Sequence, residues 1–254
     1  MNLILVDRAE IDKQGLVTLT DRRAAHICKV LKAEVGSCLR TGVINAAIGE
    51  AKIQKIHYKN SCSVTLQLDS TLLSPASNTK ACPAKLPITL IIALPRPKVA
   101  RRLVRLCTEC GIAELHFINS YRVEKSFWQS PLLSEANIHQ QILLGLEQSR
   151  DTQLTKVFMH KRFNPFVEDT LAALPKTQQQ FVAHPYNAAI DLTDNNQLQT
   201  IDKQQPILLA IGPEGGFIPY EIDKLNQAGL VNLGFGQRIY RVETIVPLLL
   251  GKLT

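Results

Sequence analysis

The part of the sequence best suited to chemistry is a glycine-rich loop that directly follows an apolar run. Residues 207–211 read ILLAI, which is typical of a buried strand, and they lead into GPEGG at residues 212–216. Glycines let a backbone approach a ligand closely, and a helix that opens at Pro219 would add free N–H groups. The glycine spacing matches neither a P-loop nor a dinucleotide-binding fingerprint. We therefore expect a ligand-binding loop of another kind, the alternative being a plain tight turn.

A second loop carries charged side chains that could take part in catalysis. The segment LGFGQRIYRVET, residues 233–244, places Arg241 and Glu243 between a short strand and the last helix, for which Thr244 would be the N-cap. These two side chains could also simply pair at the surface. Because loops that follow parallel strands open at the same edge of a sheet, we expect this loop and the glycine-rich loop to converge.

A basic helix is expected at residues 97–110. Apolar side chains recur there at spacings of three and four, which turns Lys98, Arg101, Arg102 and Arg105 outward. A row of cations with little acid beside it is typical of phosphate contacts to a nucleic acid. The alternative is a solvated helix surface.

The excess positive charge is concentrated around this helix. The chain of 254 residues has a formal net charge of +7, and its Lys, Arg, Asp and Glu give +3 for residues 1–79, +6 for 80–130 and −2 for 131–254. This clustering favours a polyanionic partner, the alternative being a merely soluble basic protein.

The hydrophobic content of 45% excludes a disordered chain. No apolar run approaches the roughly 20 residues of a membrane span, and no secretory signal is visible, so we expect a cytoplasmic protein without a membrane partner.

The six cysteines include one closely spaced pair, Cys107 and Cys110. A zinc site would need a second pair of Cys or His at ligand spacing, and none follows, so we expect no metal. A redox pair would stand at the start of a helix, whereas this pair ends one. We therefore expect buried helix residues, and thiols that stay reduced in the cytosol.

The elements that must position these residues divide the chain in two. The first seventy residues read as short strands at 16–19, 38–42, 47–56 and 63–68 with one helix near 21–31, which suggests a small barrel. After a turn-rich stretch, strands and helices alternate as in a parallel α/β sheet. The expected strands there are 88–94, 114–118, 181–183, 207–211 and 230–233, and the expected helices are 97–110, 138–148, 219–228 and one from about residue 244. This pattern predicts domains at 1–72 and 87–254, joined by a linker at 73–86.

Together these motifs resemble those of the RsmE family, the 16S rRNA uridine-N3 methyltransferases of the SPOUT superfamily. The resemblance is carried by GPEGG at 212–216 and by LGxxxRIxRxET at 233–244. It extends to HIxxVLK at 26–32 with Gly36, to EQSR at 147–150, and to His184-Pro185 at the end of an expected strand. It covers nearly the whole chain, and two short glycine-rich motifs in this order rarely arise together by chance.

The resemblance implies a fold, a cofactor and a substrate. The fold is a PUA-like β-barrel that binds RNA, followed by a SPOUT α/β methyltransferase domain with a deep trefoil knot, an exception to the rule that chains are unknotted. The resemblance also implies S-adenosyl-L-methionine (SAM) without a metal, a homodimer in which the partner completes each site, and a target uridine in the 16S rRNA of the small ribosomal subunit. By the same resemblance, the cofactor would be lined by His184, Ile211, Gly212, Gly216, Leu233, Gly234, Ile239 and Arg241.

Methylation at uridine N3 sets two further requirements. The N3 proton must leave as the nitrogen attacks, so we assign Arg241 to stabilising the uridine anion and Glu243 to acting as the base or orienting Arg241. N3 lies on the Watson–Crick edge, so the base must be unpaired. The side chains expected to hold the phosphates of the RNA are Arg8, Arg22, Arg23, Lys98, Arg101, Arg102 and Arg105.

The sequence departs from the family pattern at several positions. Ile218 stands where a hydroxyl usually caps the helix, Tyr240 where leucine is common, and Ile245 where alanine is common. The loop RVEKSFW at 122–128 is unusually rich in charges and aromatic rings, and its Trp128 would serve as core packing or as a stacking platform.

Two other functions remain open at this point. One is a non-catalytic RNA-binding or ribosome-assembly module, which would bind no adenosyl ligand. The other is a SPOUT methyltransferase that acts on a ribose 2′-hydroxyl or on tRNA, which the N-terminal barrel disfavours.

Overall fold

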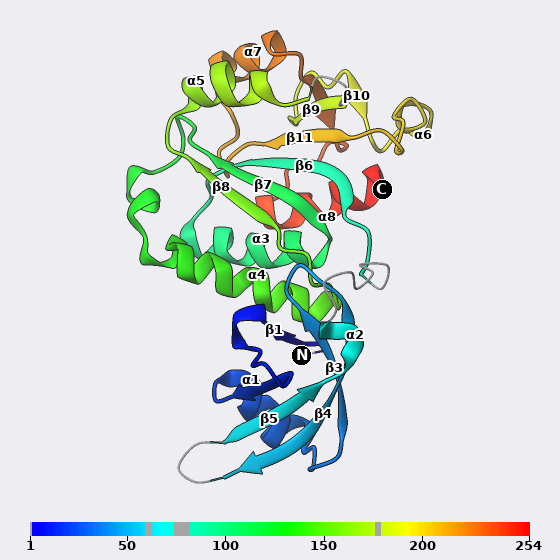
Figure 1. The fold of residues 1–254 in the computed structure, drawn as a ribbon. Helices are drawn as coiled ribbons and strands as arrows, with labels where there is room; N and C mark the ends of the chain where they lie inside the picture. Colours follow the sequence, from blue (N-terminus) through cyan, green and yellow to red (C-terminus); the bar gives the residue numbers. More distant parts are fainter. Residues whose placement is uncertain (1, 59–61, 74–81, 176–178) are drawn as a thin grey trace. The chain divides into compact units, whose positions relative to one another are not determined.

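A computed structural model describes residues 2–58, 62–73, 82–175 and 179–254 (Figure 1). The chain divides into two compact units. The N-terminal unit comprises Met1–Ala84 and Ile142–Leu154, and the C-terminal unit comprises Lys85–Gln141 and Thr155–Thr254. Most of the linker expected at 73–86 lies outside the described residues. Residues 142–154, which the sequence pattern places in the second domain, group with the first unit.

The N-terminal unit is built on a five-stranded sheet with the order β1-β3-β4-β5-β2. Its strands are β1 (Ile4–Val6), β2 (Leu16–Leu19), β3 (Cys38–Val43), β4 (Ile48–His57) and β5 (Ser63–Leu68). β1 pairs with β3 in parallel, and the other neighbours are antiparallel. Along β5, Val64, Leu66 and Leu68 are buried at every second position, because successive side chains of a strand point to opposite faces. These side chains belong to the core of the unit.

Short helices flank this sheet. They are the 3-10 helix η1 (Arg8–Glu10), α1 (Arg22–His26), the π-helix η2 (Ile27–Leu31) and α2 (Ser70–Leu73). α1 begins after Asp21, whose carboxylate accepts a hydrogen bond from the Arg23 backbone N–H. The helix expected at 21–31 therefore consists of an α-helical and a π-helical part, and it ends at Lys32 in the left-handed conformation (φ 50°).

The C-terminal unit contains a seven-stranded sheet with the order β10-β12-β9-β11-β6-β7-β8. Its strands are β6 (Leu86–Ala93), β7 (Ile112–Ile118), β8 (Lys156–His160), β9 (Gln179–Ala183), β10 (Ile190–Asp191), β11 (Ile207–Ile211) and β12 (Val231–Gly234). All neighbouring strands are parallel. Every residue of β11 is buried, as expected for a strand covered on both faces. The mixed α/β fold with a parallel sheet is thus confirmed.

Helices cover both faces of this sheet, with α3 and α8 on one side and α5 and α7 on the other (Figure 1). The helices of the unit are α3 (Pro97–Glu109), α5 (Phe163–Pro165), α6 (Asn195–Leu198), α7 (Pro219–Gln227), α8 (Val242–Leu253), the 3-10 helices η4 (Lys125–Gln129) and η5 (Pro131–Leu133), and the π-helix η6 (Phe166–Leu171). The helix α4 (Glu135–Ser149) begins in this unit, and its residues from Ile142 on belong to the N-terminal unit. The expectation that Thr244 caps the last helix is wrong. The helix begins at Val242, because Arg241 is the last residue with an extended backbone.

The cysteines are distributed differently from the expectation in one respect. Cys28 and Cys62 form a disulfide within the N-terminal unit, so the expectation that all six stay thiols is wrong for this pair. Cys107 is buried on α3 and its burial raises the pKa of the thiol, as expected for a packing residue.

In the described ranges, no cluster of three or more His, Cys, Asp or Glu is arranged to hold a metal ion. Nor does any helix in those ranges have the length and hydrophobicity to cross a membrane.

Candidate functional site

The loops that follow β9, β11 and β12 surround a cavity of about 500 Å³. These strands are parallel neighbours, so their carboxyl ends meet at one edge of the sheet, where α/β proteins bind ligands. The two glycine-containing loops converge there, as predicted. Of the residues predicted to line the cofactor, the cavity is lined by His184, Ile211, Gly212, Gly216, Leu233 and Ile239. Gly234 and Arg241 are not among its lining residues.

Two glycines of the GPEGG loop are needed for different reasons. A Cβ at Gly212 would lie 3.0 Å from the backbone nitrogen of Phe217, so a side chain would push the two ends of the loop apart. Gly216 has a φ of +73°, a conformation that residues with a side chain rarely adopt. Its N–H donates a 2.7 Å hydrogen bond to the carbonyl of Pro213, which closes the turn. The loop therefore presents backbone to the cavity.

The buried carboxylate of Glu221 ties this loop to the one after β7. It accepts hydrogen bonds from the backbone N–H of Ile218 (3.0 Å), the hydroxyl of Ser120 (3.0 Å) and the backbone N–H of Tyr121 (2.7 Å). Glu221 lies in the first turn of α7, where its carboxylate supplies the half of a capping box that satisfies the backbone N–H of residue 218. Ile218 has no hydroxyl to supply the other half, and the backbone N–H of Glu221 donates to the Ile218 carbonyl at 2.9 Å instead.

Arg122, in the loop after β7, also contacts the GPEGG loop. Its guanidinium donates a hydrogen bond to the carbonyl of Gly215, and its side chain lines the cavity. The sequence pattern marked its loop as unusual without assigning Arg122 a role. In the same loop, the indole N–H of Trp128 donates to the Asn119 side chain at 3.0 Å and the ring is half-buried, which favours packing over stacking.

The second loop is also held by a carboxylate. Asp191 at the end of β10 accepts hydrogen bonds from the N–H of Thr193 (2.9 Å) and of Gly236 (3.1 Å). The bonds from Thr193 are the main cause that lowers the pKa of Asp191. Gly234 faces Ala188, whose Cβ would be only 2.7 Å from a Cβ at position 234. Gly234 therefore allows the loops after β9 and β12 to approach each other.

The predicted catalytic pair lies at the start of α8. Arg241 is the exposed N-cap residue, and Glu243 is in the first helical turn. The carboxylate of Glu243 lies 3.5 Å from the guanidinium of Arg102 on α3, so the alternative of an Arg241–Glu243 surface pair is not what the structure shows. His184 lines the cavity and packs edge-on against Tyr186, and its burial lowers the pKa of its imidazole.

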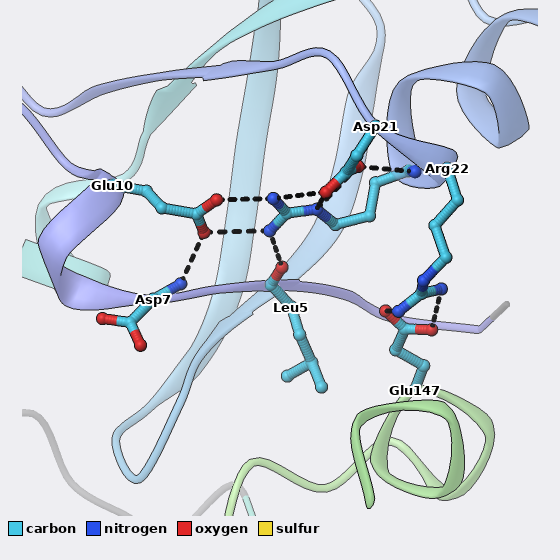
Figure 2. Close-up of polar contacts among 7 residues, drawn as sticks. Leu5, Asp7, Glu10, Asp21, Arg22 and Glu147 are labelled. Carbon is cyan, nitrogen blue, oxygen red and sulfur yellow. Dashed lines mark hydrogen bonds and ion pairs between the residues drawn. The ribbon is translucent and has the colours of Figure 1, made fainter. Parts of the chain in front are cut away.

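The predicted phosphate-binding residues of the N-terminal unit differ in their surroundings, and Figure 2 shows the pairing of Arg22 with Glu147. Arg8 is exposed. Arg22 forms two 2.7 Å hydrogen bonds with Glu147. Arg23 donates to Glu10, to Asp21 and to the carbonyl of Leu5, and the hydrogen bond from Arg23 is the main cause that lowers the pKa of Glu10. Arg22 and Arg23 are therefore already bound by carboxylates.

The predicted phosphate-binding residues of α3 line a separate surface hollow of about 570 Å³. Arg105 pairs with Glu109 at 2.9 Å and Arg102 with Glu243 at 3.5 Å. Lys98 and Arg101 are exposed, and no described carboxylate pairs with them. The helix thus presents a basic face in which half of the cations are already partly neutralised.

Comparison with known proteins agrees with this architecture. The chain is 27% identical over 246 residues to the ribosomal RNA small subunit methyltransferase E of Treponema pallidum (96% of this chain, 87% of the relative) and 24% identical to the ribosomal RNA small subunit methyltransferase E 1 of Borreliella burgdorferi (96% and 93%). Its fold matches the ribosomal RNA small subunit methyltransferase E of Neisseria gonorrhoeae, solved with S-adenosyl methionine, with a TM-score of 0.68 at 16% identity (99% and 95%). Residues 82–254 match the RNA methyltransferase domain family. Since that match spans most of the chain, the protein belongs to this family of RNA methyltransferases.

Proposed function

We propose that the protein transfers a methyl group from SAM to N3 of a uridine in the 16S rRNA of the small ribosomal subunit. The observation that carries the proposal is the convergence of the loops at 212–216 and 233–244 around one cavity, in a chain of an RNA methyltransferase family. The names of the Treponema and Borreliella relatives support the small-subunit rRNA as substrate. The family resemblance described above supports uridine N3 as the acceptor.

The residues of the cavity fit SAM. Its volume of about 500 Å³ is in the range of cofactor sites, and it combines apolar side chains with exposed loop backbone. Ile211, Leu233 and Ile239 offer apolar contacts for an adenine ring, and Gly212 and Gly216 leave the backbone accessible. Gly234 would contribute by keeping two loops of the site together, and Arg241 by reaching the site from the α8 N-terminus. When bound, SAM supplies an activated methyl group on a sulfonium.

The chain's own residues have three tasks in the reaction. The loops must hold the target base in line with the donor, because orientation supplies much of the rate of such a transfer. Arg241 stabilises the negative charge that develops on the uracil ring as N3 loses its proton. Glu243 accepts that proton or orients Arg241. No metal is needed for these steps.

The finer features of the fold belong to the same proposal. The N-terminal domain, 1–72, would be a PUA-like barrel that binds RNA, joined by the linker 73–86 to a SPOUT domain at 87–254 with a trefoil knot. The protein would act as a cytoplasmic homodimer whose partner completes each site. The five-stranded sheet with its own core supports the separate domain, and the exposure of Arg241 leaves room for a partner surface beside it.

RNA contacts outside the cavity complete the proposal. Arg8, Lys98 and Arg101 are exposed and able to meet phosphates directly. Arg102 and Arg105 would exchange a carboxylate for a phosphate, whereas Arg22 and Arg23 would keep their carboxylate partners and contact a phosphate in addition.

A calorimetric titration with S-adenosylhomocysteine (SAH), the product of methyl transfer, tests the cofactor assignment. We expect one bound molecule per chain, and we expect a bulky side chain at Gly212 to abolish binding because it would fill the loop. If the folded chain binds no SAH, the non-catalytic RNA-binding alternative is correct and the proposed function is wrong.

A further inference from the structure

The carboxyl edge of the seven-stranded sheet carries a set of basic side chains, to most of which the sequence motifs assign no role. Several of its strands are followed, within a few residues, by exposed cations. These are Arg96 after β6, Arg122 after β7, Lys161 and Arg162 after β8, and Arg238 after β12. We call these five side chains the basic rim. Because the strands are parallel, all five lie at the edge that holds the cavity.

Hydrogen bonds join several of the loops that carry the rim. The backbone N–H of Arg96 donates to the Glu214 carboxylate at 3.3 Å, which joins the loops after β6 and β11. The hydrogen bond from Arg122 to the Gly215 carbonyl joins the loops after β7 and β11. The Tyr220 hydroxyl lies 3.2 Å from the Asn164 side chain, which connects α7 to the segment after β8. Arg122 and Arg238 also line the cavity itself.

The cations of the rim differ from the other basic residues in their pairing. Within the described ranges, none of its five side chains forms an ion pair. By contrast, Arg22, Arg23, Arg102 and Arg105 each have a carboxylate partner. Exposed carboxylates also follow these strands: Glu124 after β7, Glu168 and Asp169 after β8, and Glu214 and Asp223 after β11. Of these, Glu168 pairs with Lys224. Unpaired cations around a cavity favour a polyphosphate ligand, because binding costs them no existing ion pair.

Exposed aromatic rings stand among these cations. Tyr121 is 80% exposed beside Arg122, and Tyr186 is 63% exposed at the wall of the cavity. The backbone of Tyr121 is held by the Glu221 carboxylate, so its position relative to the GPEGG loop is set by a buried contact. Aromatic rings interleaved with cations are typical of surfaces that bind single-stranded RNA, where bases stack on the rings and phosphates meet the cations.

We infer that the basic rim is the docking surface for an unpaired stretch of the RNA substrate, with Tyr186 stacking on a base at the mouth of the cavity. Lys161, Arg162 and Arg122 hold the phosphates on one side of the cavity, and Arg238 holds them on the other. The inference takes its substrate class from the proposed function and adds the place and residues of recognition. This docking surface is distinct from the basic face of α3, which lines a different hollow.

Two pairs of substitutions with equal loss of charge test the rim. The double variant Lys161→Gln/Arg162→Gln removes two rim cations outside the cavity. The control, Lys156→Gln/Lys203→Gln, removes two exposed cations at the start of β8 and before β11, toward the opposite edge of the sheet. Binding is measured by fluorescence anisotropy with labelled oligouridylate of about ten nucleotides, a length within the range of single-strand sites. SAH titration of each variant reports on the cavity.

We expect the rim variant to lose about tenfold in RNA affinity at low salt, and its plot of log affinity against log salt to become shallower by about 1.4, or 0.7 for each lost phosphate contact. The control should bind RNA like the wild type, and both double variants should bind SAH like the wild type. Tyr186→Ala should lose about tenfold, the scale of one stacked base, whereas Tyr186→Phe should retain wild-type affinity.

The inference is wrong if the rim variant and the charge-matched control bind RNA equally, or if Tyr186→Ala binds as tightly as the wild type. Those results with normal SAH binding would leave the proposed function standing. Failure of the wild-type protein to bind SAH would instead overturn the proposed function, whatever the rim variants do.

Discussion

Arg22, the first residue of α1, and Glu147, near the end of α4, form a bidentate ion pair within the N-terminal unit (Figure 2). Both hydrogen bonds are 2.7 Å long, and the Glu147 side chain is only 2% exposed. Planar, two-pronged pairing of this kind is the strongest form of the Arg–carboxylate interaction. The pair joins two segments that are 125 residues apart in sequence. Glu147 is therefore a buried charge that depends on Arg22.

Substitution of Arg22 by Gln should destabilise the protein because it leaves the Glu147 carboxylate buried without its cation. Removing one partner of a fully buried pair costs about 3–5 kcal/mol, and we expect about 2–3 kcal/mol here since Arg22 is partly exposed. Urea unfolding measures the change. The double variant Arg22→Gln/Glu147→Gln should recover part of the loss, and a single variant as stable as the wild type would contradict the structural role of the pair.

Alanine should weaken SAH binding at one glycine of the C-terminal unit and stabilise a helix at another. Gly234→Ala places a Cβ 2.7 Å from that of Ala188, so the loops after β9 and β12 must separate and SAH affinity should fall at least about tenfold. Gly251→Ala lies in α8 with no neighbour within 4 Å and should stabilise the helix by about 0.5–1 kcal/mol. Calorimetry with SAH and thermal unfolding measure both. Equal SAH affinity in the two variants would mean that Gly234 does not shape the site.

Acid should destabilise the C-terminal unit through His116. Burial lowers the pKa of this imidazole from 6.5 to about 4. Its Nδ1 lies 3.0 Å from Nε2 of His160, and burial lowers the pKa of His160 as well. The unfolded chain therefore binds a proton below pH 6.5 that the folded chain takes up only near pH 4. Stability should fall as the pH drops between these values, by about 3 kcal/mol from His116.

The variant His116→Phe isolates this effect, because phenylalanine fits among the neighbouring rings of Phe158 and Phe166 and does not titrate. Urea unfolding between pH 7 and pH 4 should show a shallower loss of stability for the variant than for the wild type. Identical pH dependence in the two proteins would show that His116 is not protonated on unfolding.

Substitution of Arg241 by Gln should lower the turnover of the methyl transfer by about 100-fold, the usual cost of removing a group that stabilises a developing anion. SAH affinity should change much less, because the Arg241 side chain does not line the cavity. Single-turnover transfer from SAM to small ribosomal subunits measures the first quantity and calorimetry the second. Wild-type turnover in this variant would remove Arg241 from the mechanism.

The sequence predicts the strands and helices whose buried side chains form a clear apolar pattern. β11 is a continuous apolar run, β6 is apolar except for Thr89 after its Pro87, and α3 keeps its apolar side chains on one face, so their positions follow from the sequence. β8 was missed because it is an edge strand with exposed and half-buried positions, and its pairing with β7 is what makes it a strand. β1 and β10 are too short to show a period.

The candidate site was predictable where the constraint lies in the backbone. Gly212 and Gly216 occupy positions that only a residue without a side chain fills easily, and such positions leave a visible motif. Arg122 left no comparable trace, because its place beside Gly215 depends on a loop held by Glu221, about a hundred residues away. For the same reason, the carboxylate partner of Arg22 could not be foreseen from its own surroundings in the sequence.

The most direct test of the account is the identity of the methylated nucleoside. Purified protein is incubated with SAM carrying an isotopically labelled methyl group and with small ribosomal subunits from a strain that lacks this protein, and the digested 16S rRNA is mapped by mass spectrometry. We expect one labelled N3-methyluridine per subunit, at a single position. Label on a ribose 2′-hydroxyl, label only in added tRNA, or no transfer by a protein that is folded would contradict it.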